Sequence, residues 1–235
     1  MESTLKSQWI NINTAQGEIF SGYLSLPPTG NGPGIVLVQE IWGVNEHIRA
    51  VADQYALDGY IVLAPDIFWR LEQRVDLTYD TDGTAKARAL LQKVDTTKAV
   101  TDLSSAVDTL RKLPEVTGKI ATLGFCLGGQ LAFRTAATGN VDAAVAYYGG
   151  GIQQHLNVAD RITKPILFHY AGLDTHIPQS AVTDVKGSFA GRSNATFFDY
   201  PNADHGFNCW GRPMYNQKAA TLAHGRTLIF LSQYL

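Results

Sequence analysis

Residues 119–129 read Lys-Ile-Ala-Thr-Leu-Gly-Phe-Cys-Leu-Gly-Gly, and this stretch decides the fold. It starts as an apolar run typical of a buried strand and passes through Gly-x-Cys-x-Gly into a run typical of a helix. A turn this tight leaves no room for side chains beside its central residue, which explains Gly124 and Gly128 on either side of Cys126. The pattern predicts a strand, a sharp turn that lifts Cys126 above the sheet edge, and a helix.

This turn resembles the nucleophile elbow of the α/β-hydrolases, with a cysteine where serine usually stands. A helix N-terminus presents unpaired N–H groups and a partial positive charge, so it favours the reactive thiolate form of Cys126. A lone cysteine is most often a small buried hydrophobic residue. The flanking glycines and the strand–helix context favour a nucleophile instead.

Strand and helix patterns alternate on both sides of the elbow. A β-hairpin is expected at residues 8–13 and 18–26. Further buried strands are expected at residues 35–38, 60–64, 141–148, 165–170 and 195–200, and helices at 45–57, 97–112 and 213–235. No repeat or linker divides the chain, so we expect a single α/β-hydrolase domain over residues 1–235. It has a mostly parallel central sheet with helices on both faces and an N-terminal β-hairpin.

Two residues after later strands complete a candidate triad with Cys126. Asp174 follows the strand at 165–170, and His205 follows the strand at 195–200, in the chain order nucleophile, acid, histidine. His205 would be the base and Asp174 would hold its tautomer and ring angle. Taken alone, Asp174 is more typical of a turn residue, and His205 is equally consistent with a satisfied loop histidine and with a base. Their joint spacing at the ends of strands favours the triad.

Other residues near strand ends are candidates for supporting roles. The backbone N–H groups of Leu127 and Ile41 are expected to hold the oxyanion. Glu40 lies among apolar residues, where a carboxylate is costly unless paired. It either pairs with Arg49 or the helix start near residue 45, or lies close to the thiol and controls its proton. Asp66 is interpreted as a structural turn residue.

The motifs together resemble the dienelactone hydrolase family. They are Gln39-Glu40-Ile41-Trp42-Gly43-Val44-Asn45, Ala64-Pro65-Asp66, Gly124-Phe125-Cys126-Leu127-Gly128-Gly129, Tyr147-Tyr148-Gly149, Gly172-Leu173-Asp174 and His205-Gly206-Phe207. The resemblance spans nearly the whole chain and implies a Cys126, His205 and Asp174 triad, with Glu40 paired to the thiol until substrate displaces it. It also implies cofactor-free hydrolysis of dienelactone to maleylacetate in aromatic-compound degradation.

The chain departs from the family pattern where substrate is held. The family binds the substrate carboxylate with arginines, one of them shortly after the catalytic histidine, and here that position is Cys209. Losing a guanidinium there removes charge-assisted recognition worth about 1.5–3 kcal/mol. The candidate substrate-binding residues are Arg70, Arg74, Arg88 and Arg212, with Trp42 and Phe207 among the aromatic residues that could line the site.

Composition limits the other possibilities. The net charge of −2 gives no indication of a nucleic-acid or anionic-membrane partner. No apolar run reaches the length of a membrane span, and the N-terminus shows no signal peptide, so a cytoplasmic protein is expected. Cys126 and Cys209 are the only cysteines and are expected to be reduced. We expect a monomer that acts on a small lactone or ester without a metal.

Three alternatives stay open at this point. The same fold and triad would serve a general carboxylesterase or thioesterase. A ligand-binding protein that kept the pocket and lost the chemistry is less favoured, because the triad is intact. A metal-dependent hydrolase using Asp174, His176 and His205 is the least favoured, because it leaves the elbow unexplained.

Overall fold

The computed structural model describes residues 4–235. Residues 1–3, part of the N-terminal segment expected to lack a signal peptide, lie outside the described residues. Within residues 4–235, no helix combines the length and apolar character needed to cross a membrane. The chain divides into two compact units, Met1–Ile120 and Ala121–Leu235, which are described separately. The expectation of one domain stays a prediction.

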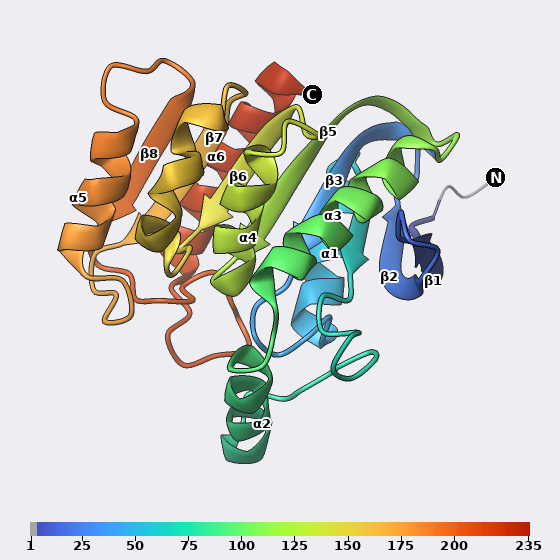
Figure 1. Cartoon of the computed structure of the whole chain (residues 1–235), viewed down its shortest axis with the longest axis horizontal. Coiled ribbons are helices and arrows are strands. Elements are labelled where there is room, and N and C mark those ends of the chain that lie inside the picture. Colours follow the sequence, from blue (N-terminus) through green and yellow to red (C-terminus); the bar gives the residue numbers. More distant parts are fainter. Residues whose placement is uncertain (1–3) are drawn as a thin grey trace. The chain divides into compact units, whose positions relative to one another are not determined.

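The first unit contains four whole strands and the start of a fifth (Figure 1). They are β1 (Lys6–Asn13), β2 (Ile19–Leu26), β3 (Gly32–Val38), β4 (Ile61–Pro65) and the start of β5 (Val116–Phe125). The whole strands have the order β1-β2-β4-β3. β1 and β2 pair antiparallel, which confirms the hairpin, and β3 and β4 pair in parallel. The apolar runs of β3 and β4 are fully buried, as expected of strands covered on both faces.

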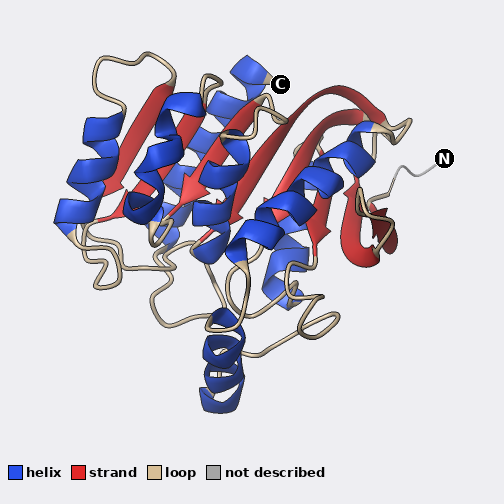
Figure 2. Cartoon of the chain, viewed as in Figure 1, coloured by secondary structure: helices blue, strands red, loops and turns tan. Residues whose placement is uncertain are grey.

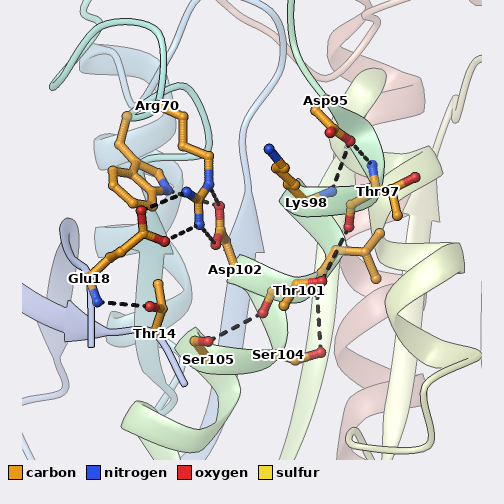
Figure 3. Close-up of polar contacts among 12 residues, drawn as sticks. Thr14, Glu18, Arg70, Asp95, Thr97, Lys98, Thr101, Asp102, Ser104 and Ser105 are labelled. Atoms are coloured by element: carbon orange, nitrogen blue, oxygen red, sulfur yellow. Dashed lines mark hydrogen bonds and ion pairs between the residues drawn. The ribbon is translucent and has the colours of Figure 1, made fainter. Parts of the chain in front are cut away.

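Among residues 4–120, the first unit has three helices; helices are drawn blue in Figure 2. They are α1 (Glu46–Leu57), α2 (Thr81–Leu91) and α3 (Thr96–Arg111). Each starts after a side chain that accepts hydrogen bonds from first-turn N–H groups, namely Asn45, Asp80 and Asp95, the last of which appears in Figure 3. α1 and α3 match the prediction. The sequence does not predict α2, because this helix buries only Gly83, Ala87 and Leu90, too few for a clear apolar period.

Asp66 organises the loop between β4 and α2. Its Oδ1 accepts a hydrogen bond from the N–H of Phe68 at 3.0 Å, and its Oδ2 accepts one from the N–H of Arg74 at 2.6 Å. The second bond holds Arg74 at φ 53°, a conformation that residues other than glycine rarely adopt. Burial raises the pKa of Asp66 to about 6. The interpretation of Asp66 as a structural turn residue is confirmed.

Arg70 ties the same loop to α3 and to the β1–β2 hairpin (Figure 3). Its Nε and Nη2 donate to the carboxylate of buried Asp102 at 3.1 and 2.9 Å, and its Nη1 donates to Glu18 at 3.0 Å. Trp69 donates to the same Asp102 carboxylate at 2.9 Å and stacks on Phe20. The nitrogens of Arg70 are thus engaged inside the first unit, and its binding of substrate stays a prediction.

The second unit alternates strands and helices (Figure 1). Its strands are the end of β5, β6 (Ala143–Tyr147), β7 (Ile166–Ala171) and β8 (Ala195–Tyr200), and its helices are α4 (Leu127–Ala136), the 3₁₀ helix η1 (Ile152–Arg161), α5 (Gln179–Ser188) and α6 (Gln217–Tyr234). The strands are parallel in the order β5-β6-β7-β8. Every predicted strand of this unit is present. α6 starts later than residue 213, because Asn216 caps it by accepting from the N–H of Ala219.

Helices lie on both faces of these strands. Neighbouring residues on a strand point to opposite faces, and on β7 Phe168 contacts Phe133 of α4 while His169 hydrogen-bonds Thr227 of α6. α4 and α6 therefore cover opposite faces (Figure 1). Because the strands are parallel, their C-terminal ends lie along one edge, and Cys126, Asp174 and His205 all follow such ends.

Candidate active site

Cys126 occupies a strained turn between β5 and α4. Its φ of 55° and ψ of −115° lie outside the regions that residues other than glycine normally adopt. Its N–H donates to the carbonyl of Tyr147 at 3.0 Å, and its carbonyl accepts from the N–H of Gln130 at 3.2 Å. Strain of this kind persists only where neighbouring contacts enforce it, and it is concentrated at functional sites. The predicted sharp turn is confirmed.

The elbow closes only because glycines surround it. A Cβ atom on Gly124 would overlap the carbonyl group of Gly128. A Cβ atom on Gly129 would lie 2.6 Å from the carbonyl oxygen of Tyr147, the group that accepts the Cys126 N–H. The structure thus gives a steric reason for glycine at positions 124 and 129.

Asp174 and His205 form a buried pair in the same unit. Oδ2 of Asp174 lies 2.7 Å from Nδ1 of His205, and the two side chains are 1% and 7% exposed. Oδ1 of Asp174 accepts from the N–H groups of His176 and Ile177 at 2.8 and 3.0 Å. One carboxylate oxygen therefore fixes the loop and the other orients the imidazole.

The second nitrogen of His205 serves Cys126. With Nδ1 held by Asp174, Nε2 is available for the hydrogen bond between the Cys126 side chain and the imidazole. Burial alone would lower the pKa of His205, but the negative charge of the Cys126 thiolate and the hydrogen bonds to Asp174 and Cys126 together raise it to about 10. This arrangement favours the protonated imidazole of His205 beside Cys126.

The surroundings of the pair suit attack on a carbonyl group. Cys126 is partly exposed, so substrate can reach its sulfur. Leu127 is the first residue of α4, and the first N–H groups of a helix have no acceptor within it. The role of the Leu127 N–H as an oxyanion donor stays a prediction.

Aromatic side chains pack near His205. The ring centroid of Tyr148 lies 5.2 Å from the ring centroid of His205 and 5.2 Å from that of Phe207. Tyr148 is fully buried and has φ 34°, so its backbone is strained immediately beyond the carbonyl that holds Cys126. Phe207, predicted to line the site, is fully buried in this aromatic cluster.

Arg212 lies beside the histidine loop, seven residues after His205. Its guanidinium occupies the space that a side chain on Gly206 would need, and Gly206 has φ 81°. Cys209, at the position where the resemblance predicts an arginine, is fully buried. The loop thus carries a guanidinium packed against Gly206, the residue after His205.

The remaining predicted site residues belong to the first unit. Glu40, Ile41 and Trp42 are buried there, and Trp42 packs edge-on against Tyr79. Arg49 pairs with Asp76 at 2.8 Å, and Asn45 caps α1. Arg88 is an exposed residue of α2. The roles of Glu40, Ile41, Trp42, Arg74 and Arg88 at the site stay predictions.

Residues 4–235 contain no cluster of three or more His, Cys, Asp or Glu side chains arranged to hold a metal ion. His176 does lie near the imidazole of His205, with its ring edge-on at 4.9 Å. Its backbone N–H, however, is what bonds Asp174.

Sequence reasoning missed a buried polar network behind the site. His169 hydrogen-bonds Tyr200 through one ring nitrogen and Thr227 through the other, and Tyr147 joins them through Thr227. The only indication in the sequence is a histidine inside the apolar strand Pro165-Ile-Leu-Phe-His-Tyr, where a polar side chain needs buried partners.

Comparison with known proteins identifies the family of the chain. Residues 20–235 match the Dienelactone hydrolase family. The chain belongs to the dienelactone hydrolase family. The predicted resemblance is therefore confirmed, and the protein is a carboxymethylenebutenolidase-like hydrolase.

Relatives within the dienelactone hydrolase family match over almost their full length. Carboxymethylenebutenolidase 1 of Cupriavidus pinatubonensis is 32% identical, over 96% of this chain and 97% of its own. Carboxymethylenebutenolidase of Pseudomonas putida is 33% identical, over 96% of each chain. The crystal structure of a candidate dienelactone hydrolase from Klebsiella pneumoniae subsp. pneumoniae has a TM-score of 0.88 at 28% identity, covering 98% of this chain and all of the other. The predicted α/β-hydrolase fold is confirmed.

Proposed function

We propose that this dienelactone hydrolase family member opens a lactone or activated ester with a Cys126, His205 and Asp174 triad. The observation that carries the proposal is the continuous contact from Asp174 through His205 to Cys126 at the strained elbow. A cysteine nucleophile needs a nearby imidazole, and the imidazole needs a group that fixes its tautomer.

Acylation starts with the thiolate. Sγ of Cys126 attacks the carbonyl carbon, and the N–H of Leu127 donates to the oxyanion that forms. As the tetrahedral intermediate collapses, the C–O bond of the ester breaks and the leaving oxygen takes the proton from Nε2 of His205. When the substrate is a lactone, the opened ring stays attached to Cys126 as a thioester.

Deacylation returns the enzyme to its starting state. Nε2 of His205 takes a proton from water, and the hydroxide attacks the thioester carbonyl. The C–S bond breaks, the acid leaves, and the thiolate re-forms beside the protonated imidazole. A thiolate forms thioesters from good leaving groups far more readily than from amides, so lactones and activated esters are favoured over peptides.

The preferred substrate is dienelactone, converted to maleylacetate without a cofactor. Names of relatives at about one-third identity support this choice. A general carboxylesterase or thioesterase is the second candidate, favoured by the buried Cys209 at the position where the family has an arginine. Arg212, packed against Gly206, is the residue we propose to hold the substrate carboxylate in its place.

A turnover panel separates the two candidates. The wild-type protein is assayed with cis- and trans-dienelactone, simple aryl esters and a thioester, and the panel is repeated with Arg70, Arg88 and Arg212 each changed to Gln. Preference for dienelactone that is lost only in Arg212→Gln supports the specific function. Equal turnover of uncharged aryl esters by all variants supports the general esterase, and no turnover of any substrate would support a binding protein.

Glu40 and Ile41 complete the proposal. Glu40 is proposed to hydrogen-bond the neutral thiol before substrate binds; when substrate displaces Glu40, the thiol proton passes to Nε2 of His205 and the thiolate that starts acylation forms. The N–H of Ile41 is proposed to be the second oxyanion donor. Glu40→Gln tests the first role, because it should change the pH dependence of Cys126 alkylation while leaving the thiol in place.

A further inference from the structure

A buried polar network lies beneath the three loops that carry the candidate triad. His169 of β7 is completely buried, with Nδ1 2.8 Å from the hydroxyl of Tyr200 and Nε2 2.9 Å from Oγ1 of Thr227. Thr227 of α6 is also completely buried and lies 2.6 Å from the hydroxyl of Tyr147. We call Tyr147, His169, Tyr200 and Thr227 the His169 network.

The main chains of its two tyrosines hold the site. The carbonyl of Tyr147 accepts the N–H of Cys126 at 3.0 Å. The carbonyl of Tyr200 accepts hydrogen bonds from the N–H of Gly172 at 2.8 Å and from the N–H of Ala203 at 3.1 Å. Gly172 precedes Asp174 in its loop, and Ala203 precedes His205 in its loop. His169 bonds Tyr200 directly and reaches Tyr147 through Thr227. It therefore connects Tyr147, which anchors the nucleophile, with Tyr200, which anchors the loops of the acid and the base.

One assignment of donors and acceptors lets the Tyr200 hydroxyl use both its oxygen and its hydrogen. Arg226 of α6, the charged group facing this cluster, hydrogen-bonds the Tyr200 side chain and can only donate. In that assignment the Tyr200 hydroxyl donates to Nδ1 of His169, and Nε2–H of His169 donates to Thr227. Burial and the charge of Arg226 lower the pKa of His169 to about 3, so the ring stays neutral.

We propose that His169 and Thr227 are positioning residues for catalysis, which set the spacing between the Cys126 elbow and the loops of Asp174 and His205. A buried polar network costs desolvation, and an apolar core of the same shape would serve stability at least as well. What the polar network adds is directional: its hydrogen bonds confine each side chain to one orientation, and the packing of apolar groups does this less strictly. The inference rests on the proposed function of the triad.

Isosteric variants test the inference. Thr227→Val removes the hydroxyl, Thr227→Ser restores it, and Tyr200→Phe cuts the other side of the His169 ring. Thr122→Val is the matched control, because Thr122 is buried on β5 and its hydroxyl has no hydrogen-bond partner within the described part of the chain. The first readout is the pH profile of Cys126 alkylation by iodoacetamide, with the labelled peptide identified by mass spectrometry to separate it from Cys209. The second is kcat and KM.

Thr227→Val and Tyr200→Phe should shift the midpoint of the alkylation profile and lower kcat by about tenfold with a smaller change in KM, because small misplacements of reacting groups are costly. Thr227→Ser and Thr122→Val should behave as wild type. The proposal is overturned if the two network variants lose thermal stability but keep the wild-type alkylation profile. If Thr227→Val does not fold, Tyr200→Phe decides alone. Alkylation needs no substrate, so a wild-type protein that hydrolyses nothing would reject the proposed function and still leave the network testable.

Discussion

Nδ1 of His205 lies 2.7 Å from Oδ2 of Asp174, with both side chains almost completely buried. A carboxylate in this position stabilises the protonated imidazole and fixes its ring so that Nε2 faces Cys126. The other oxygen of Asp174 is already bonded to two backbone N–H groups of its own loop. The pair is therefore rigid before substrate arrives.

Asp174→Asn should abolish most activity without unfolding the protein. The amide oxygen can keep the loop hydrogen bonds of His176 and Ile177, but the amide NH₂ then faces Nδ1 and imposes the wrong tautomer. We expect kcat to fall on the order of 10³–10⁴-fold, measured under saturating substrate. Asp199→Asn is the control, since Asp199 is half-exposed and pairs only with Lys186 at the surface. A kcat for Asp174→Asn within a few-fold of wild type would be inconsistent with the pair.

The ionisation of His205 should depend on Cys126. The pKa of His205 is raised to about 10 from 6.5 because the thiolate charge and hydrogen bonds outweigh burial. A histidine whose pKa is higher when folded contributes stability that is fully present below 6.5 and is lost as pH rises towards about 10. The free energy of unfolding of the wild-type protein should therefore fall between pH 7 and 10, and that of Cys126→Ala should fall by less.

Two measurements check this dependence: chemical denaturation at several pH values and NMR titration of the His205 ring. In Cys126→Ala the His205 titration should move to lower pH. An unchanged titration in that variant would mean that the thiolate does not act on the imidazole.

Gly124→Ala should prevent the elbow from closing. The new methyl group would overlap the Gly128 carbonyl, which is backbone and cannot move without breaking the turn. We expect a loss of several kcal/mol, of the order of severe overpacking, or failure to fold. Gly225→Ala is the matched control, because nothing lies within 4 Å of a Cβ there. In the interior of α6 this change should stabilise by about 0.5–1 kcal/mol in thermal or chemical denaturation. Equal stability of the two variants would contradict the steric explanation.

Arg70→Gln should weaken the fold of the first unit. It leaves the buried Asp102 carboxylate without its bidentate partner, although Trp69 still donates to it. Arg70 is itself 29% exposed, so we expect a loss of about 1–3 kcal/mol in chemical denaturation rather than the larger cost of a fully buried pair. The exposed Arg88→Gln should change stability by less than about 0.5 kcal/mol. Unchanged stability in Arg70→Gln, with a raised KM for carboxylated substrates only, would show that Arg70 serves the substrate instead.

The positions of the candidate triad could be predicted because parallel strands bring their C-terminal ends to one edge. Cys126, Asp174 and His205 each follow an apolar run, and those runs form β5, β7 and β8. The need for glycine at position 124 could be predicted as well, because the atoms that crowd it belong to Gly128, which is close in the sequence. The local pattern of apolar residues was sufficient to predict most of the strands, α1 and α3.

The features that could not be predicted depend on distant residues or weak patterns. α2 and α5 each bury only three residues, so their apolar period is faint. Thr227 meets His169 across 58 positions and Tyr147 across 80, and no local spacing indicates such pairs. The partners of Arg70 are similarly remote, because Asp102 and Glu18 lie on other elements.

Turnover of a lactone or aryl ester by Cys126→Ala, beside wild type, tests the central claim most directly. The methyl side chain fits the elbow, so the variant should fold, and circular dichroism verifies this. We predict a fall in kcat/KM of at least about 10³-fold, since no other group in the triad can form the thioester. Near-wild-type turnover by the folded variant would contradict the assignment of Cys126 as the nucleophile.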